Sequence, residues 1–164
     1  MKKFIVSFLL LLPFVLSAQE VKIAIVNTNE VFNLMPETTV LENEMSALMS
    51  QLQTTMKEMQ DEYNRKMTDL QAKGDSLTEN IRNLRIQEIT QLDERMQNFV
   101  PMAEEEREKK YNELLAPIQE KMLKAIRDVG DENGYTCIVN PQVLLYTGKV
   151  IDATEKVKAK LGLK

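Results

Sequence analysis

Histidine and tryptophan are absent from this chain of 164 residues, and Cys137 is its single cysteine. Without histidine there is no imidazole base, no histidine metal ligand and no histidine-containing catalytic triad. The five glycines stand apart, with no Gly-x-Gly and no Gly-Lys-Ser/Thr sequence, so the sequence lacks a phosphate-binding loop. Four tyrosines and five phenylalanines are also few for a conventional core of this length. The sequence therefore predicts a protein that is not an enzyme and that needs no metal or cofactor.

The first 18 residues have the pattern of an export signal. Two lysines precede an apolar stretch at 4–16, and small residues end the segment at Ala18. A membrane anchor is the alternative, but a spanning helix needs about 20 apolar residues and this stretch is shorter. We expect cleavage between Ala18 and Gln19, which releases the mature protein into the periplasm. In that oxidising compartment Cys137 has no second cysteine to pair with, and we expect it to be inert, buried in a strand.

Charge argues against nucleic acid as a partner. The whole chain has 21 basic and 25 acidic residues, for a net charge of −4. Removal of Lys2 and Lys3 with the signal leaves 19 basic residues against 25 acidic ones, a net charge of −6. Phosphate binding needs clustered positive charge, which this chain does not have.

An eleven-residue repeat runs through the first half of the chain. Its apolar residues are separated by steps of four, three and four, which average about 3.67 residues per turn and predict a long, nearly straight helix with one narrow seam. Charged residues fill the other faces, so the seam needs a partner helix. The nine seam residues are Leu41, Met45, Leu48, Leu52, Met56, Met59, Tyr63, Met67 and Leu70.

The partner helix is predicted from the sequence that follows. We expect a hairpin over 38–129 with its tip near 74–76, where Gly74, in the left-handed conformation, would end the first helix and Ser76 would cap the second. Thr38 or Thr39 would cap the first helix. Pro101 and the fully charged stretch 104–110 predict a bend or loose packing. The expected inner face of the second helix comprises Leu77, Ile81, Leu84, Ile89, Leu92, Met96, Phe99 and Ala103, then Ile118, Met122, Ala125, Ile126 and Val129.

The remaining segments, 19–37 and 130–164, are predicted to form a small β body. Strands are expected at 21–27 and 135–139, and a β-hairpin is expected to join 143–146 to 149–151 before a last helix to Leu161. These segments total 54 residues, a size at which a domain is marginal by itself, so oligomerisation is expected. The predicted fold class is α+β, mostly α, with a long antiparallel helical hairpin on a small β body.

Several sequence segments together point to a family. In order they are Lys22–Asn27 followed by Val31-Phe32, Leu41–Met45, Gly134–Asn140, Val143–Tyr146 and Asp152–Thr154. In this order and spacing the mature sequence resembles the Skp/OmpH family of periplasmic chaperones. The resemblance implies a homotrimer whose short strands form a shared barrel. It also implies hairpin tentacles around a cavity that holds unfolded outer-membrane β-barrel proteins without ATP. Well-known relatives are strongly basic, whereas this chain is acidic, which argues against contact with lipopolysaccharide or a membrane.

The residues expected to meet clients are apolar and lie off the seam: Met49, Ile86, Val100 and Met102. The alternative is that they are ordinary exposed apolar residues, while the seam methionines only pack the hairpin. The strand residues Ile23, Ile25, Ile138 and Val139 are expected at the oligomer interface, with a role in the subunit core as the alternative. Adjacent carboxylates at 104–106 suggest a cation site, but they point about 100 degrees apart along a helix, which favours a solvated face.

We interpret the sequence as that of an ATP-independent periplasmic holdase that shields unfolded outer-membrane proteins. The rival interpretation is a structural coiled-coil adaptor of the cell envelope that binds a folded partner through its hairpin tip. Such an adaptor should have a specific exposed patch at 73–80, where this sequence is small and polar.

Overall fold

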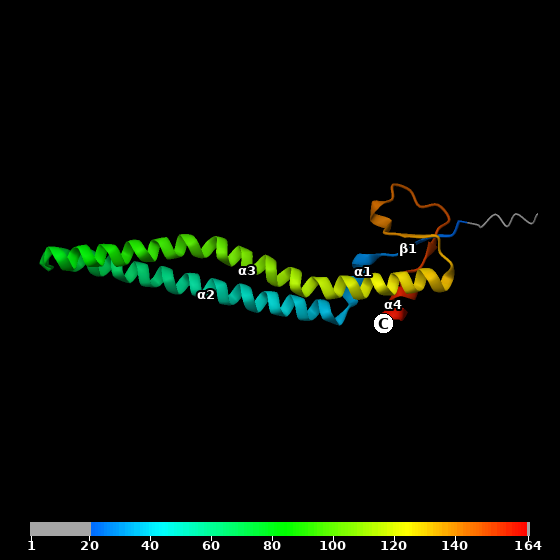
Figure 1. Ribbon diagram of the computed structural model, residues 1–164, viewed down its shortest axis with the longest axis horizontal. Coiled ribbons are helices and arrows are strands. Elements are labelled where there is room, and N and C mark those ends of the chain that lie inside the picture. Colours follow the sequence, from blue (N-terminus) through cyan, green and yellow to red (C-terminus); the bar gives the residue numbers. More distant parts are fainter. Residues whose placement is uncertain (1–20, 164) are drawn as a thin grey trace, which may run out of the picture.

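The computed structural model describes residues 21–163, so the expected cleavage site at Ala18 and Gln19 lies outside the described residues. A small body sits at one end of a long two-helix hairpin (Figure 1). None of the helices among the described residues is long and apolar enough to cross a membrane. In chain order the elements are β1 (Ile23–Ile25), α1 (Thr28–Leu34), α2 (Pro36–Lys73), η1 (Gly74–Ser76), α3 (Glu79–Asn133), β2 (Cys137–Val139), η2 (Pro141–Val143), β3 (Ile151–Asp152) and α4 (Thr154–Leu161).

The body is built on a three-stranded parallel sheet in the order β2-β1-β3. Ile25 of the central strand is opposite Val139 on one side and Asp152 on the other. The N-terminal strand is thus held between two strands from the tail. The predicted strands at 21–27 and 135–139 are found in shorter form, and the predicted mostly α fold with a long hairpin and a small β body is confirmed.

The predicted β-hairpin in the tail is wrong. Residues 143–146 form no strand, and Ile151 pairs with Ala24 of β1. The apolar run after η2 has high β propensity but finds no strand partner among the described residues, which leaves it as an exposed loop. Cys137 is also exposed, because it lies in an edge strand, so the expectation of a buried thiol is wrong.

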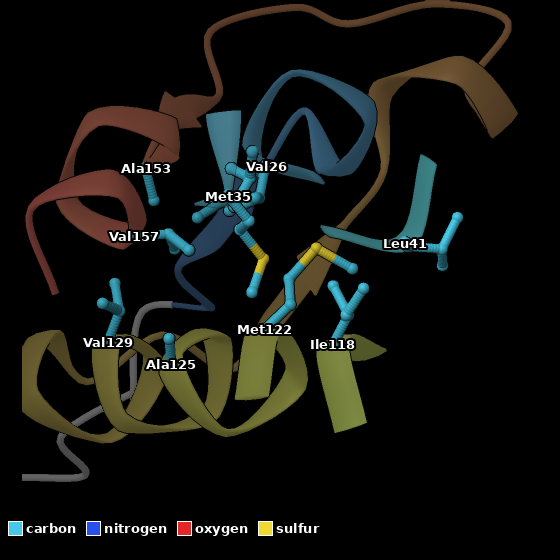
Figure 2. Packing of buried hydrophobic residues seen from close by; sticks show 11 residues of the cluster. Val26, Met35, Leu41, Ile118, Met122, Ala125, Val129, Ala153 and Val157 are labelled. Atoms are coloured by element: carbon cyan, nitrogen blue, oxygen red, sulfur yellow. The ribbon is translucent and has the colours of Figure 1, made fainter. Parts of the chain in front are cut away.

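The core of the body lies between the sheet, the short helices and the far end of α3. In Figure 2 Val129 of α3 points toward Val157 of α4, and Met122 of α3 points toward Met35, which follows α1. The long helix therefore belongs to both the hairpin and the body. Burial of this apolar surface is the main stabilising contribution. The buried cluster comprises Ala24, Val26, Val31, Met35, Leu41, Ile118, Met122, Ala125, Val129, Ala153 and Val157.

Polar contacts fix the short C-terminal helix in this body. The Asn27 amide donates to Thr154 Oγ1 at 3.0 Å, and the Thr154 amide donates to Asp152 Oδ1 at 2.9 Å. The hydrogen bonds from Thr154 lower the pKa of the Asp152 carboxyl. Lys158 forms an ion pair with Glu30 of α1 at 2.8 Å. The start of α4 is therefore bonded to the loop after β1.

The eleven-residue seam of α2 is confirmed, since none of its nine residues is exposed. The predicted inner face of α3 is correct for Leu92, which is fully buried, but wrong near the tip, where Ile81 and Leu84 are 43% and 49% exposed. The reason is a step of five residues between Leu84 and Ile89, which rotates the apolar stripe by about 140 degrees around the helix. Ile81 and Leu84 are therefore out of phase with the buried stripe.

Both capping predictions are wrong. The first long helix begins at Pro36, two residues before the expected Thr38 cap, because proline suits the first helical position. The Thr38 hydroxyl donates instead to the Phe32 carbonyl at 2.7 Å. At the tip, the Ser76 hydroxyl donates back to the Lys73 carbonyl at 2.7 Å, and Thr78 is the N-cap of α3.

Two glycines should respond oppositely to alanine. Gly74 ends α2 as predicted, but the expected left-handed conformation is wrong, because its φ is −52° in a right-handed turn that continues into η1. A Cβ added to Gly74 would lie 3.9 Å from the nearest Leu70 atom. Gly74→Ala should therefore stabilise the protein by about 0.4–1 kcal/mol. Gly134 ends α3 with φ of 64°, so Gly134→Ala should destabilise it by about 1–2 kcal/mol. Urea unfolding at one protein concentration measures both, and equal effects of the two changes would contradict this account of the turns.

Candidate functional site

Two grooves run along the middle of the hairpin, one on each side of the seam. No residue lines both of them. Gln51 lines one groove and Gln53 lines the other. Side chains two positions apart in a helix point about 200 degrees apart around its axis, so the grooves lie on opposite flanks of the hairpin. Their linings differ chiefly in charge, with five charged side chains in one groove and two in the other.

The first flank carries an apolar groove of about 610 Å³, formed by α2 and α3. It brings together Met49 and Val100, two of the four residues predicted to meet clients. Both are about half exposed, at 48% and 52%. The remaining lining is formed by Ser46, Ser50, Leu52, Gln53, Met56, Phe99, Ala103, Glu104 and Arg107.

The other two predicted client residues lie elsewhere. Ile86 is 45% exposed and Met102 is 65% exposed, and neither lines the apolar groove. Conversely, Met56 was assigned only to the seam of α2 and Phe99 only to the inner face of α3, yet both also line the groove. Half-burial does not distinguish them, because Met59, a seam residue that lines neither groove, is half-buried as well.

The opposite flank carries a charged groove of about 640 Å³. Lys110 forms an ion pair with Glu44 of α2 at 2.7 Å, and this hydrogen bond raises the pKa of the Lys110 ammonium. Part of the charged stretch of α3 therefore contacts α2 near Glu44, and the contact between the two helices there is ionic rather than apolar. In Figure 1 α3 changes direction in this part of the hairpin, in agreement with the bend that the sequence predicts near Pro101. The lining residues are Asn43, Glu44, Ala47, Leu48, Gln51, Glu106, Lys109, Lys110 and Glu113.

Nearer the tip, an ion pair between side chains joins the two helices. Glu88 of α3 accepts from Lys66 of α2 at 3.0 Å and from Arg85 at 3.1 Å. Lys66, and then Arg85, lower the pKa of the Glu88 carboxyl. A pair that joins the helices fixes their register at this height.

No group of three or more His, Cys, Asp or Glu side chains within residues 21–163 is arranged to hold a metal ion. Glu104 is engaged by Arg107 at 2.7 Å, in agreement with a solvated charged face at 104–106.

The body presents a second apolar surface. Of the residues expected at an oligomer interface, Ile23 is 43% exposed, while Ile25, Ile138 and Val139 are half-buried. An added Cβ on Gly130 of α3 would lie 3.4 Å from the Ile138 Cδ1 atom, so Ile138 also packs within its own subunit. The sequence did not identify the most exposed large apolar residues within 21–163, which lie at the end of η2 and in the loop that follows it: Val143 at 72%, Leu145 at 106% and Tyr146 at 86%.

Comparison with known proteins gives one family match and a structural likeness. A sequence model described as outer membrane protein (OmpH-like) matches residues 22–161. No curated protein matches the chain. The chain superposes on the crystal structure of a proposed OmpH-like outer membrane chaperone from Caulobacter crescentus CB15 with a TM-score of 0.75. The two are 12% identical, and the match covers 85% of this chain and 82% of that one. At this identity the likeness shows a shared fold.

Proposed function

This chain belongs to the OmpH-like family of outer membrane proteins, and on that basis we propose that it is an ATP-independent holdase chaperone of the periplasm. Its clients would be unfolded outer-membrane β-barrel proteins, which it would shield from aggregation without catalysing any reaction. The observation that carries the proposal is the apolar groove, because a methionine-lined surface adapts to many sequences.

The holdase is proposed to act as a homotrimer joined through its β body. The apolar loop at 143–146 is more exposed than any other apolar segment of the body, and contiguous exposed apolar surface marks interaction sites. The edge strands β2 and β3 each pair on one side only among the described residues. Unpaired edges of this kind accept strands from another chain. These features support a barrel shared between subunits.

One observation favours the rival function, a coiled-coil adaptor that binds a folded partner through its tip. Ile81 and Leu84 are exposed close to the turn, so the distal end is less polar than its sequence indicates. An adaptor of this kind would lose its partner when both residues are changed to serine. A holdase with its contacts in the middle of the hairpin would retain its clients.

The test is mass measurement and light scattering on the mature protein, with a urea-diluted outer-membrane barrel protein as client. We expect three subunits per particle and suppressed scattering without ATP. Binding should survive high salt, because exposed charge pairs are screened with a Debye length of about 3 Å at 1 M salt and apolar contact is not. Unsuppressed scattering would refute the holdase, and steep loss of binding in salt would show that charge holds the client.

A further inference from the structure

We propose that the apolar groove around Met49 and Val100 is the client site of this chain, and that it takes uncharged apolar side chains of an extended, unfolded segment. This inference rests on the proposed holdase function and assigns it to one flank of the hairpin. The opposite flank, with its charged groove, would face solvent or a neighbouring subunit. Met102 then has no part in client binding, although its exposure exceeds that of Met49.

The charge of the groove argues for an uncharged occupant. The two ionic side chains of its lining, Glu104 and Arg107, pair with each other through two hydrogen bonds, at 2.7 and 3.1 Å. The guanidinium of Arg107 therefore neutralises the carboxylate of Glu104, and the rim of the groove has no net charge to attract a charged ligand. A charged side chain placed beside Met49 and Val100 would lose water without gaining a partner.

The polar part of the lining matches the other half of an unfolded segment, its peptide groups. Ser46, Ser50 and Gln53 lie at steps of four and three along α2, so they form one exposed row beside the apolar residues. Their hydroxyl and amide groups both donate and accept hydrogen bonds. An extended segment can place an apolar side chain against Met49 and Val100 and its unpaired backbone along this row. A folded partner has few unpaired peptide groups to offer.

The volume is sufficient for such an occupant. At about 610 Å³ the groove falls within the range of about 300–1,000 Å³ typical of ligand pockets. Both methionines of the lining are unbranched and adjust to different side chains. The groove thus has the size for a large apolar side chain and the adaptability for many sequences.

The test uses the full mature protein and short fluorescein-labelled peptides, with a Gly/Ser sequence around a central Phe-Val-Phe, Glu-Val-Glu or Lys-Val-Lys. Anisotropy should show binding of the Phe peptide only. The double variant M49S/V100S should weaken that binding about tenfold, because it removes apolar contact area on both helices. The matched control M102S removes a more exposed methionine from outside the groove and should change affinity less than about twofold. All three side chains are exposed, so unchanged circular dichroism is expected in every variant.

A second measurement identifies the occupant directly. A photoreactive benzoylphenylalanine at position 50, replacing Ser50, should cross-link to the Phe peptide. Cross-linking to a second copy of the chain instead would overturn the proposal, as would equal effects of M102S and M49S/V100S. If M49S/V100S suppresses aggregation of the barrel protein as well as the wild type and M102S do, the groove is not the client site, but the holdase function stands. If the wild-type protein itself suppresses nothing, the proposed function fails as well.

Discussion

Replacement of Ala24 with aspartate is expected to unfold the β body and, with it, to abolish the proposed trimer. Ala24 is fully buried in the central strand, between β2 and β3. A carboxylate there would be surrounded by apolar side chains, and an uncompensated buried charge costs about 3–5 kcal/mol. That is a large part of the stability of a small domain, which is typically about 5–15 kcal/mol in total.

Sedimentation velocity and urea unfolding followed by circular dichroism measure this effect together. Val21→Asp is the matched control, since the same charge is introduced two residues before β1 at a site that is 65% exposed. It should change the free energy of unfolding by no more than about 0.5 kcal/mol. An Ala24→Asp protein with the wild-type midpoint and mass would show that this strand is not the centre of the body.

Two leucines of α3 should differ sharply when each is shortened to alanine. Leu92 is fully buried in the hairpin, whereas Leu84 is 49% exposed. Leu92→Ala leaves a cavity and should destabilise the protein by about 2–5 kcal/mol. Leu84→Ala should cost less than about 1 kcal/mol, because solvent already reaches the side chain.

Urea unfolding at a fixed protein concentration separates the two variants, since both replace the same residue in the same helix. Hydrogen exchange adds the location: amides near Leu92 should exchange faster in Leu92→Ala, while those near Leu84 should be unchanged in Leu84→Ala. Equal losses of stability would mean that the stripe of α3 continues in phase to the tip.

The sequence predicted the hairpin well because its signal is periodic and long. Nine residues at regular steps from Leu41 to Leu70 define one face of α2, and burial follows that face closely. The same reasoning failed at Leu84, where the spacing to Ile89 breaks the period. The caps at Thr38 and Ser76 failed because local side-chain preferences are weak compared with tertiary contacts, such as that of Thr38 with the Phe32 carbonyl.

The candidate site was predicted only in part, for a physical reason. Exposure of Met49 and Val100 follows from their positions off the seam, but their meeting in one groove depends on the register of α2 against α3. That register is set by contacts between residues far apart in the chain, such as Lys110 with Glu44. A single sequence contains no direct signal for such a pairing. The parallel pairing of β1 with Ile151 was missed for the same reason.

The position of β1 in the sheet also dictates the order in which the chain can fold. Its partners are residues 137–139 and 151–152, and the Asn27 amide bonds to Thr154, 127 residues away in sequence. Contacts of such separation form late, because closing a long loop costs entropy, whereas the hairpin can close from its tip, where Lys66 bonds to Glu88 only 22 residues away. A chain made from its N-terminus therefore carries an unpaired apolar strand until residues 137–139 and 151–152 have been made. During that interval the β body is unfolded and its central strand is exposed, even where the hairpin has already formed.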